Sequence, residues 1–328
     1  MASKIKVAVA GFGNLGRGVE LAVSRNSDME LTGIFTRRNP KKLIPCGDKA
    51  LVHALDSIKE FVDAIDVLIL CGGSKSDLFE QGPALAAMFN TVDSFDTHPK
   101  IPGYFEAVNC SAESNGTIAI ISVGWDPGLF SLNRLYGEAI LPDAATYTFW
   151  GKGLSQGHSD ALRRVEGVRG AVQYTIPAPD AMQRVRSGAR PELSTREKHT
   201  RDCYVVLEPG ADAENVKRAI VTMPDYFADY DTSITFISAE ELQKNHSVMP
   251  HGGVVIRTGE TGAGATQVME YSLKLDSNPE FTASVLTAYA RAAFRLNQQG
   301  QVGAKTVFDI PPGLLSPKSA AMLRKELL

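Results

Sequence analysis

Three glycines near the N-terminus have the spacing of a dinucleotide-binding turn. An apolar run, Ile5–Ala10, precedes Gly11, Gly13 and Gly16 in a GxGxxG pattern, and an amphipathic stretch starts at Arg17. In such a strand–turn–helix unit the first glycine permits the tight turn, the second lets backbone N–H groups approach a pyrophosphate, and the third lets helix and strand pack closely. The helix N-terminus adds a positive dipole end. The pattern predicts a dinucleotide site, and a purely structural glycine turn is the alternative.

The end of the second expected strand indicates which dinucleotide is bound. That strand, residues 29–35, is followed by Thr36, Arg37 and Arg38. An NAD site usually has an Asp or Glu at this place for the ribose 2′-hydroxyl, and this strand end has none. Two guanidiniums instead suit a 2′-phosphate, which they can bind in bidentate fashion. We therefore predict NADP as the cofactor, and a solvated arginine pair is the alternative.

Two aspartates follow further expected strand ends. Asp96 and Asp126 each come just after a predicted parallel strand, and ligands of such sheets bind at the carboxyl ends of the strands. The two carboxylates would suit an ammonium group, and either one could accept a proton. A helix cap at Asp96 and a turn before Pro127 are the alternatives. Cys71, at another strand end, has no base near it in the sequence, so we interpret it as a small residue lining the cofactor site.

Polar residues of the second half have a different chemistry. Trp150 ends an expected strand and is followed by residues 151–160, a glycine-rich stretch with Ser, Gln and His that we interpret as a loop. Arg201 and His251 are both able to bind a carboxylate. A single histidine such as His158 is more often structural than catalytic. Neither histidine has the spacing of a metal site, so no metal is expected.

The chain of 328 residues is long enough for about two domains. Its hydrophobic share of 44% and charged share of 22% are ordinary for a globular protein, and its net charge of −3 argues against a nucleic-acid binder. Four scattered cysteines without a CxxC pair favour a reducing compartment, so we expect a cytoplasmic protein. The sequence shows no signal-peptide core and no apolar run near the roughly 20 residues of a membrane helix. We expect neither nucleic acid nor membrane as a partner.

The elements that must position these residues fall into two groups. Short apolar runs alternate with helix-like stretches up to about residue 122, which predicts an α/β, Rossmann-type doubly wound parallel sheet. From 123 to 279 the expected strands alternate apolar and polar residues, as in a mixed or antiparallel sheet with one covered face. We predict an NADP-binding domain, 1–122, and an α+β substrate domain on a mixed sheet, 123–279. The segment 280–328, with a long helix over 281–299, is expected to complete the first domain.

Eight blocks of the sequence resemble the meso-diaminopimelate D-dehydrogenase family. The longest, FWGKGLSQGHSDALRR at 149–164, is highly specific, and together the blocks extend over nearly the whole chain. They comprise residues 11–17, 33–38, 92–98, 124–128, 149–164, 223–227, 249–253 and 275–279.

The resemblance implies a reversible, NADP-dependent oxidative deamination. A hydride leaves the D-configured carbon of meso-2,6-diaminopimelate, and hydrolysis of the imine gives ammonia and L-2-amino-6-oxoheptanedioate, which cyclises to tetrahydrodipicolinate. The reverse reaction makes diaminopimelate for lysine and peptidoglycan synthesis. The resemblance also implies a cytosolic homodimer, built through the second domain. Family members often have Ser at Thr36 and Tyr at Phe12 and Phe95, departures that put no role in doubt.

The residue patterns above and the family resemblance together imply the site residues. Asp96 and Asp126 are the expected catalytic residues, and which of them acts as base stays open, because close acids titrate as a pair. Another NADP-dependent amino-acid dehydrogenase, a dihydrodipicolinate-reductase-like enzyme and a non-catalytic NADP sensor are the alternatives. The expected substrate-binding residues are Asp96, Asp126, Trp150, Gln156, Gly157, Thr175, Arg201, His251 and Asn278. The expected cofactor-binding residues are Gly11, Phe12, Gly13, Asn14, Leu15, Gly16, Thr36, Arg37, Arg38, Cys71, Gly72, Gly73, Ser74, Ser94, Phe95, Asp96, Val123, Gly124, Trp125, Asp126 and Pro127.

Overall fold

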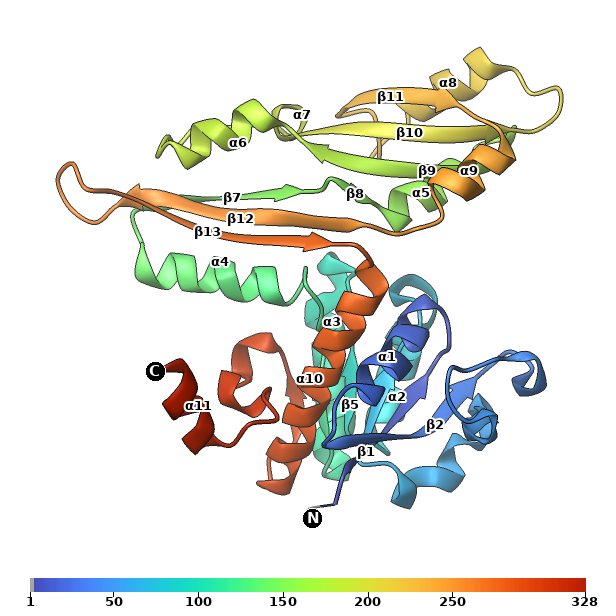
Figure 1. Cartoon of the computed structure of the whole chain (residues 1–328), viewed down its shortest axis with the longest axis vertical. Helices are drawn as coiled ribbons and strands as arrows, with labels where there is room; N and C mark the ends of the chain where they lie inside the picture. The colour runs from blue at the N-terminus through green and yellow to red at the C-terminus, as the bar shows by residue number, and fades with distance from the viewer. Residues whose placement is uncertain (1–2) are drawn as a thin grey trace. The chain divides into compact units, whose positions relative to one another are not determined.

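The computed structural model describes residues 3–328, apart from the side chain of residue 50. These residues form two compact units, and Figure 1 labels many of their helices and strands. Unit 1 consists of residues 3–132 together with 279–328, and unit 2 of residues 133–278. The first boundary falls inside helix α4 (Leu129–Ile140), later than the expected position near residue 122. The second falls at the start of helix α10 (Asn278–Gln298).

Unit 1 contains a parallel sheet with the order β14-β6-β5-β4-β1-β2-β3 in the described part of the chain. This confirms the predicted doubly wound parallel sheet. The sequence analysis did not single out β3 and β14, which form the two edges of this sheet. The strands are β1 (Ile5–Ala10), β2 (Met29–Thr36), β3 (Val52–Ala54), β4 (Val67–Leu70), β5 (Thr91–Asp93), β6 (Ile118–Ile120) and β14 (Gly303–Lys305).

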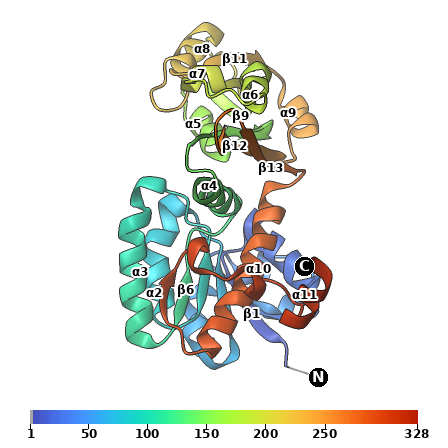
Figure 2. The same ribbon diagram turned by 90° about the vertical axis from the view of Figure 1, so that its left-hand side faces the viewer.

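Helices cover both faces of this sheet. The helices α1 (Asn14–Ser24) and α10 pack on one face, and α2 (Phe79–Ala86) and α3 (Ile101–Asn115) pack on the other, as Figure 2 shows for α10, α2 and α3. Val7 and Val9 of β1 belong to the first core, and the alanine that follows each of them belongs to the second. Because both faces are covered, the strands are buried on both sides and appear in the sequence as continuous apolar runs.

The C-terminal segment adds to unit 1 after α10. That helix ends before Gly300, which has a left-handed φ of +79°, as the glycine predicts. The next strand, β14, then pairs with β6 at the edge of the sheet. The short helices of unit 1 are η1 (Pro40–Lys42), η2 (Lys49–Leu51), η3 (Leu55–Ala64), η4 (Ser74–Leu78), η5 (His98–Lys100), η6 (Val307–Asp309), η7 (Pro312–Leu314) and α11 (Ala320–Leu327).

Unit 2 contains the predicted mixed sheet and also an antiparallel one. In the mixed sheet, of order β11-β10-β9-β8, strand β10 pairs parallel with β11 and antiparallel with β9. In the other sheet β12 pairs antiparallel with β13 on one side and with β7 on the other. The strands are β7 (Ala144–Trp150), β8 (Gly153–Leu154), β9 (Val168–Pro177), β10 (His199–Leu207), β11 (Asp231–Phe236), β12 (His251–Glu260) and β13 (Thr266–Leu275).

Two segments differ from their predicted structure. The prediction of a loop over 151–160 is wrong for much of this stretch, because α5 (Gln156–Arg163) begins inside it, after Ser155. This helix packs Ala161 and Leu162 into the core of unit 2. The helix-like pattern of residues 76–90 also predicts a single helix, but the structure divides this stretch into the π-helical turn η4 and α2, which has Pro83 inside it. The remaining helices of unit 2 are α6 (Pro179–Arg186), α7 (Thr195–Lys198), α8 (Ala213–Val221) and α9 (Ala239–Asn245). None of the described helices has the length and apolar character needed to cross a membrane.

Candidate active site

The turn between β1 and α1 has the backbone shape that a dinucleotide needs. Gly11 has a φ of +99°, in the left-handed region that favours glycine. A Cβ at Gly16 would lie 2.2 Å from the carbonyl oxygen of Gly11, so a side chain there would force the turn and the helix apart. Gly13 precedes α1, and a Cβ built on it has no heavy atom within 4 Å, which leaves this backbone accessible. The first turn of α1 therefore fits a pyrophosphate.

Arg37 and Arg38 are held beside this turn at the end of β2. The Arg38 guanidinium donates a hydrogen bond to the carbonyl oxygen of Phe12, and the Arg38 N–H donates to Thr36 Oγ1 at 3.1 Å. The Arg37 side chain is 64% exposed, and its Nη2 lies 2.7 Å from Asp77 Oδ1. Each guanidinium has one such contact, and both arginines lie near the turn, which favours a phosphate-binding role over a solvated pair.

Asp77 is a residue that the sequence analysis missed. It lies in η4, after β4, and its Oδ2 accepts a hydrogen bond from the Gly73 N–H at 3.0 Å. Burial opposes its charge, but the Gly73 hydrogen bond and the Arg37 guanidinium hold the pKa of Asp77 below its ordinary value. An ionised Asp77 therefore orients Arg37 and connects the end of β2 to the loop after β4. No local signal reveals this pair, because the two residues belong to different elements.

Cys71 starts the loop after β4 and packs against the glycine turn. Its N–H donates to the carbonyl oxygen of Ala10 at 2.7 Å, and a Cβ at Gly11 would lie 3.1 Å from the Cys71 carbonyl carbon. Burial raises the pKa of the Cys71 thiol far above its ordinary value, so the thiol stays protonated and is a weak nucleophile. This geometry agrees with a lining residue.

A buried carboxylate, Asp93, joins the two loops that carry the expected catalytic acids. It ends β5 and is 1% exposed. Its Oδ1 accepts hydrogen bonds from the N–H groups of Phe95 at 2.9 Å and Ser122 at 3.1 Å, and its Oδ2 accepts one from the Tyr104 hydroxyl at 2.7 Å. Burial raises the pKa of Asp93, and these donors oppose that effect. The sequence analysis passed over Asp93 because it belongs to the strand itself.

Asp96 and Asp126 follow the backbone that Asp93 anchors. Asp96 is exposed, and its N–H donates to Ser74 Oγ at 3.1 Å, which ties it to the loop after β4. Asp126 is half-buried in a turn that a backbone bridge closes. Because β5 and β6 are neighbours in the sheet, both acids lie at the same edge as the glycine turn. Unit 1 thus brings together the cofactor-site residues and both acids.

In unit 2, the loop after β7 packs against β9 and the start of β12. The Gly151 N–H donates to the carbonyl oxygen of Gly252 at 2.8 Å, and a Cβ at Gly151 would lie 2.1 Å from the carbonyl oxygen of Thr175. A Cβ at Gly153 would lie 2.5 Å from the Cγ of the His251 ring. The absence of side chains at these two glycines therefore lets the loop contact Thr175 and His251.

Arg201 lies in β10 opposite Thr175 of β9 and is 5% exposed. Its guanidinium donates to Thr175 Oγ1, and its Cζ lies 3.7 Å from the centroid of the Tyr230 ring. Its Nε has no hydrogen-bond partner among the described residues, and no described carboxylate forms an ion pair with it. Burial lowers its pKa, yet arginine stays charged at neutral pH. A buried cation without an anion suits a ligand with a carboxylate.

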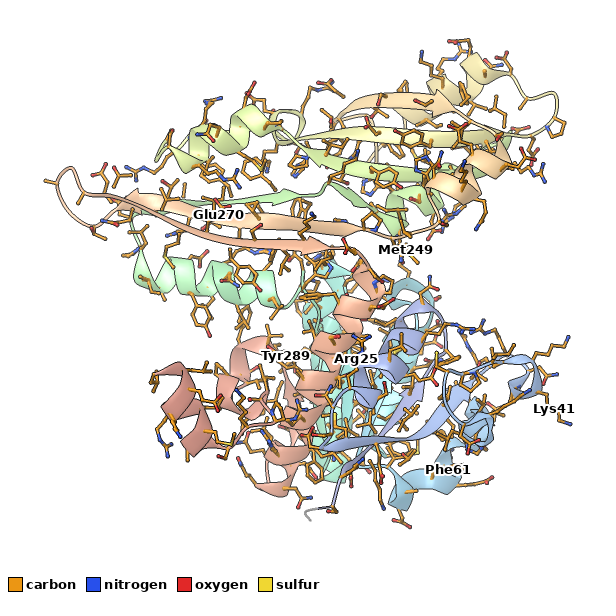
Figure 3. The ribbon with its side chains drawn as sticks, in the orientation of Figure 1. Arg25, Lys41, Phe61, Met249, Glu270 and Tyr289 are labelled. Atoms are coloured by element: carbon orange, nitrogen blue, oxygen red, sulfur yellow. The ribbon has the colours of Figure 1, made fainter. Side chains whose placement is uncertain are left out.

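Met249 contacts two further residues that are expected to bind the substrate. Gln156 Nε2 lies 3.2 Å from Met249 Sδ, and the Asn278 N–H donates to the Met249 carbonyl oxygen at 2.9 Å; Figure 3 labels Met249. Gly157, in the first turn of α5, has open space where a Cβ would stand. Through these contacts unit 2 joins the substrate-binding candidates Trp150, Gln156, Gly157, Thr175, Arg201, His251 and Asn278 into one connected group.

The structure agrees with a structural role for His158. Its Nδ1 lies 2.9 Å from Ser155 Oγ, and its ring packs edge-on against Tyr226 and Phe227. In the part of the chain that is described, no group of three or more His, Cys, Asp or Glu side chains is placed to hold a metal ion.

Comparisons with known proteins find the same kind of enzyme over almost the whole chain. The family described as diaminopimelic acid dehydrogenase C-terminal domain matches residues 124–277. Meso-diaminopimelate D-dehydrogenase of Lysinibacillus sphaericus is 64% identical over 326 residues, which are 99% of this chain and 100% of that protein. A solved variant of the Clostridium tetani enzyme, with DAP, is 53% identical with a TM-score of 0.95. An engineered D-amino acid dehydrogenase bound to NADP+ is 44% identical with a TM-score of 0.88. Both structures cover 99% of this chain and 100% of their own.

The Clostridium tetani variant is substituted at a Gln, a Thr, an Arg, a Pro, a His and an Asn. The same residue types occur here in the same order, and the spacings of 19, 26, 49, 1 and 27 residues between them are also the same: Gln156, Thr175, Arg201, Pro250, His251 and Asn278. Of these, Pro250 is the residue that the sequence analysis did not single out. Its carbonyl oxygen accepts a hydrogen bond from the Leu154 N–H at 2.8 Å, within the same group of contacts. By its identity to relatives along almost its entire length, the chain belongs to the meso-diaminopimelate D-dehydrogenase family.

Proposed function

We propose that this protein catalyses the oxidative deamination of meso-2,6-diaminopimelate at its D-configured carbon, with NADP+ as oxidant. The substrate loses a hydride from that carbon and a proton from its nitrogen, and water converts the imine to L-2-amino-6-oxoheptanedioate and ammonia. The reverse reaction, from the cyclised product tetrahydrodipicolinate, supplies diaminopimelate for lysine synthesis. The observation that carries the proposal is Arg201, a buried cation without an anion, because the substrate has a carboxylate at each end.

NADP+ supplies the hydride acceptor when it is bound. We assign the pyrophosphate to the turn at Gly13, where the backbone is accessible, and the 2′-phosphate to Arg37 and Arg38. Asp77 orients Arg37 toward this place. We also assign the lining of the cofactor site to the segments 71–74, 94–96 and 123–127, because they follow the carboxyl ends of β4, β5 and β6.

Asp96 and Asp126 are the proposed catalytic acids. Their carboxylates have the charge to hold a substrate ammonium and the chemistry to accept its proton. Because both lie at the same sheet edge, we treat them as a pair and assign the base to neither alone.

Residues of unit 2 are the proposed partners of the substrate carboxylates and of its polar ends. Thr175 Oγ1 accepts hydrogen bonds from Arg201 and from Gln173, the latter at 3.3 Å, so its own O–H is left to donate to a carboxylate oxygen. The matched residues of the substituted Clostridium tetani enzyme support these positions. We assign substrate contacts to Trp150, Gln156, Gly157, Thr175, Arg201, His251 and Asn278.

The proposal is tested by mixing the protein with NADP+ and diaminopimelate and following the absorbance of the reduced nicotinamide. We expect reduction with the meso isomer, much slower reduction with NAD+ in place of NADP+, and none with the L,L isomer, which has no D-centre. Equal rates with both isomers would contradict the stereochemical assignment. Binding of NADPH without any turnover would indicate a cofactor-sensing protein.

We also propose a cytoplasmic homodimer with unit 2 at the interface. The apolar side chains of Tyr136, Ile140 and Val268, all in unit 2, are 44%, 64% and 40% exposed, and a second copy of the chain would cover such residues. Light scattering on the eluting protein gives its mass. We expect twice the chain mass for the natural sequence and a monomer for Ile140→Glu.

A further inference from the structure

A buried histidine, His199, supports the last residue of β7. It begins β10 and is 2% exposed. Its Nε2 accepts a hydrogen bond from the Trp150 N–H at 2.9 Å. Its ring also stacks on the Trp150 indole, with centroids 5.4 Å apart and planes at 28°. One imidazole therefore contacts both the backbone and the side chain of Trp150.

The hydrogen bond requires a neutral imidazole, because only an unprotonated Nε2 can accept. The surroundings provide this state. Burial, followed by the positive charges of Arg201 and Lys198, lowers the pKa of His199 to about 4. His199 is therefore neutral at physiological pH, with its proton on Nδ1.

The backbone of Trp150 is also held by the neighbouring strands. It pairs with Gly253 of β12, and the next residue, Gly151, is fixed against Gly252 and Thr175. Its side chain is still 37% exposed. His199 contacts the exposed indole as well as the backbone N–H of the same residue.

The register of β10 links this indole to the proposed carboxylate site. His199 and Arg201 are two residues apart on one strand, so their side chains leave the same face of the sheet. One strand thus provides Arg201 directly and fixes Trp150 through His199. The middle of diaminopimelate consists of methylene groups, which the face of an indole can cover.

We propose that His199 is a positioning residue, which fixes the Trp150 indole in register with Arg201 so that the methylene chain of the substrate is recognised together with its carboxylate. This inference rests on the proposed function. It assigns a role in specificity to a residue that contacts the substrate only through another side chain.

Two substitutions separate the two contacts that His199 makes. His199→Phe keeps an aromatic ring and removes the acceptor, whereas His199→Gln keeps an acceptor near the position of Nε2 and removes the ring. We expect His199→Phe to raise the KM for meso-diaminopimelate about tenfold, as for a lost buried hydrogen bond, with the KM for NADP+ and kcat nearly unchanged. His199→Gln is expected to recover part of this loss.

His246→Phe is the matched control. His246 is also in unit 2. Its ring is tilted against that of Tyr204, with centroids 4.2 Å apart, and its Nδ1 lies 3.0 Å from the Tyr174 hydroxyl. It has no contact with Trp150 among those described. This control should change thermal stability and leave both KM values as they are. If His199→Phe behaves in the same way, His199 has only a structural role.

Fluorine NMR gives a reading that does not depend on turnover. The chain has two tryptophans, Trp125 and Trp150, so protein labelled with 5-fluorotryptophan gives two resonances, which Trp125→Phe assigns. We expect the Trp150 resonance to shift and broaden in His199→Phe, and the Trp125 resonance to stay. An unchanged Trp150 resonance would overturn the inference. If the natural protein failed to oxidise meso-diaminopimelate, the proposed function would fail, while this spectrum would still report on the placement of the indole.

Discussion

Arg201 shows how a single buried charge can carry a functional argument. A guanidinium whose partners are hydroxyl groups and an aromatic ring, without a carboxylate, is only partly compensated for its lost water. By contrast, Arg257 is 7% exposed and donates to the carbonyl oxygens of Leu141 and Pro142, so its charge is satisfied within unit 2. Burial of the Arg201 guanidinium therefore costs more free energy than burial of the Arg257 guanidinium. Arg201 is available to bind a ligand, whereas Arg257 stabilises unit 2.

Arg201→Met should reduce catalysis without reducing stability. Removal of a buried, incompletely paired charge is neutral or stabilising, whereas a substrate carboxylate that loses its partner costs about 2–5 kcal/mol. Steady-state kinetics and thermal melting measure both effects. Arg257→Met is the comparison, and it should lower the melting temperature. If the activity of Arg201→Met were undisturbed, Arg201 would not belong to the site.

The same variant identifies which end of the substrate Arg201 binds. If it binds the non-reacting end, Arg201→Met should narrow the difference in kcat/KM between meso-diaminopimelate and simple D-amino acids. If it binds the reacting end, kcat/KM should fall by a similar factor for both substrates.

Replacement of Arg37 and Arg38 by alanine should remove the preference for NADP+. Each charged hydrogen bond to a phosphate contributes roughly 1.5–3 kcal/mol, so the double variant should lose several kcal/mol with NADP+ and little with NAD+. Titration of both reduced cofactors measures the two affinities. A retained preference would show that the 2′-phosphate binds elsewhere.

His199 also predicts a pH dependence of stability. Its pKa is about 4 in the folded chain against 6.5 as the ordinary value, so the unfolded chain binds the extra proton first as the pH falls. The stabilisation is complete above pH 6.5 and is lost between 6.5 and 4, by up to about 3 kcal/mol. Denaturant unfolding at several pH values should show this loss in the natural chain and a smaller one in His199→Gln. Parallel curves for both would contradict a depressed pKa.

At the scale of elements, the Asp93 carboxylate connects the ends of β5 and β6 through hydrogen bonds. Three donors from three segments meet on one carboxylate, and both loops that leave it carry a proposed catalytic acid. The position of one loop is therefore coupled to that of the other through Asp93.

Asp93→Ala should weaken NADPH binding about tenfold, because the N–H groups of Phe95 and Ser122 lose their buried acceptor. Tyr104→Phe removes the third donor and leaves these two N–H groups bonded, so NADPH affinity should hardly change. Fluorescence titration with NADPH measures both variants. Equal losses would mean that the effect is a general loss of stability.

The sequence predicts elements well where one local signal determines them. The glycine turn and the parallel strands follow from apolar periodicity and from glycine chemistry, and each lies close to its expected position. Helix α5 is missed because Gly157 and polar neighbours hide its start, although Ser155 before it and the apolar pair Ala161 and Leu162 are signals that could have revealed it. Helix capping and spacing would have been sufficient there.

Partners from distant elements could not be predicted. Asp77 meets Arg37, and His199 meets Trp150, only after sheets and loops have formed. Such pairs depend on strand register and on loop shape, which local composition does not encode. The resemblance supplied the residues expected to contact the substrate, but not the residues that hold them in place.

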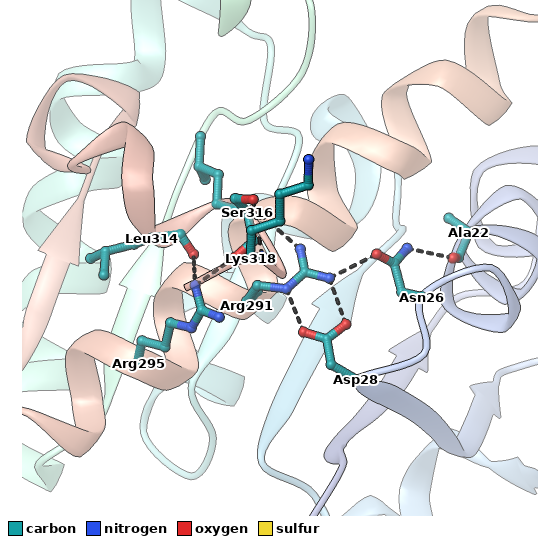
Figure 4. A network of polar contacts seen from close by, with 9 residues as sticks. Ala22, Asn26, Asp28, Arg291, Arg295, Leu314, Ser316 and Lys318 are labelled. Atoms are coloured by element: carbon teal, nitrogen blue, oxygen red, sulfur yellow. Dashed lines mark hydrogen bonds and ion pairs between the residues drawn. The ribbon is translucent and has the colours of Figure 1, made fainter. Parts of the chain in front are cut away.

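At the scale of the whole molecule, the two parts of unit 1 are joined by a buried network around Arg291. Its side chain, 2% exposed, forms an ion pair with Asp28 at 2.6 Å and donates to Asn26 Oδ1 at 2.7 Å and to the Leu315 carbonyl oxygen at 2.8 Å (Figure 4). The hydrogen bond from Arg291, despite burial, keeps the pKa of Asp28 below its ordinary value. Helix α10 is thereby attached to the β1–β2 region and to the segment after η7.

Arg291→Met should destabilise unit 1 by about 3–5 kcal/mol, because Asp28 is left without its partner. Arg186→Met, which removes the more exposed ion pair with Glu270, is the control and should cost less than about 1 kcal/mol. Denaturant unfolding measures both changes. Proteolysis should also cut the segment after α10 faster in Arg291→Met, and equal cutting of both variants would argue against this attachment.

The division of unit 1 between two distant stretches of sequence has a consequence for synthesis. A ribosome makes residues 133–278 before it makes α10 and β14, so the chain of unit 2 already exists while the parallel sheet still has β6 as an open edge. An open edge of this kind offers unpaired N–H and C=O groups to other chains. During synthesis the nascent protein therefore has an incomplete unit 1 with an exposed strand edge that is prone to aggregation. Translation that stalls between residues 278 and 303 would leave the chain in this state.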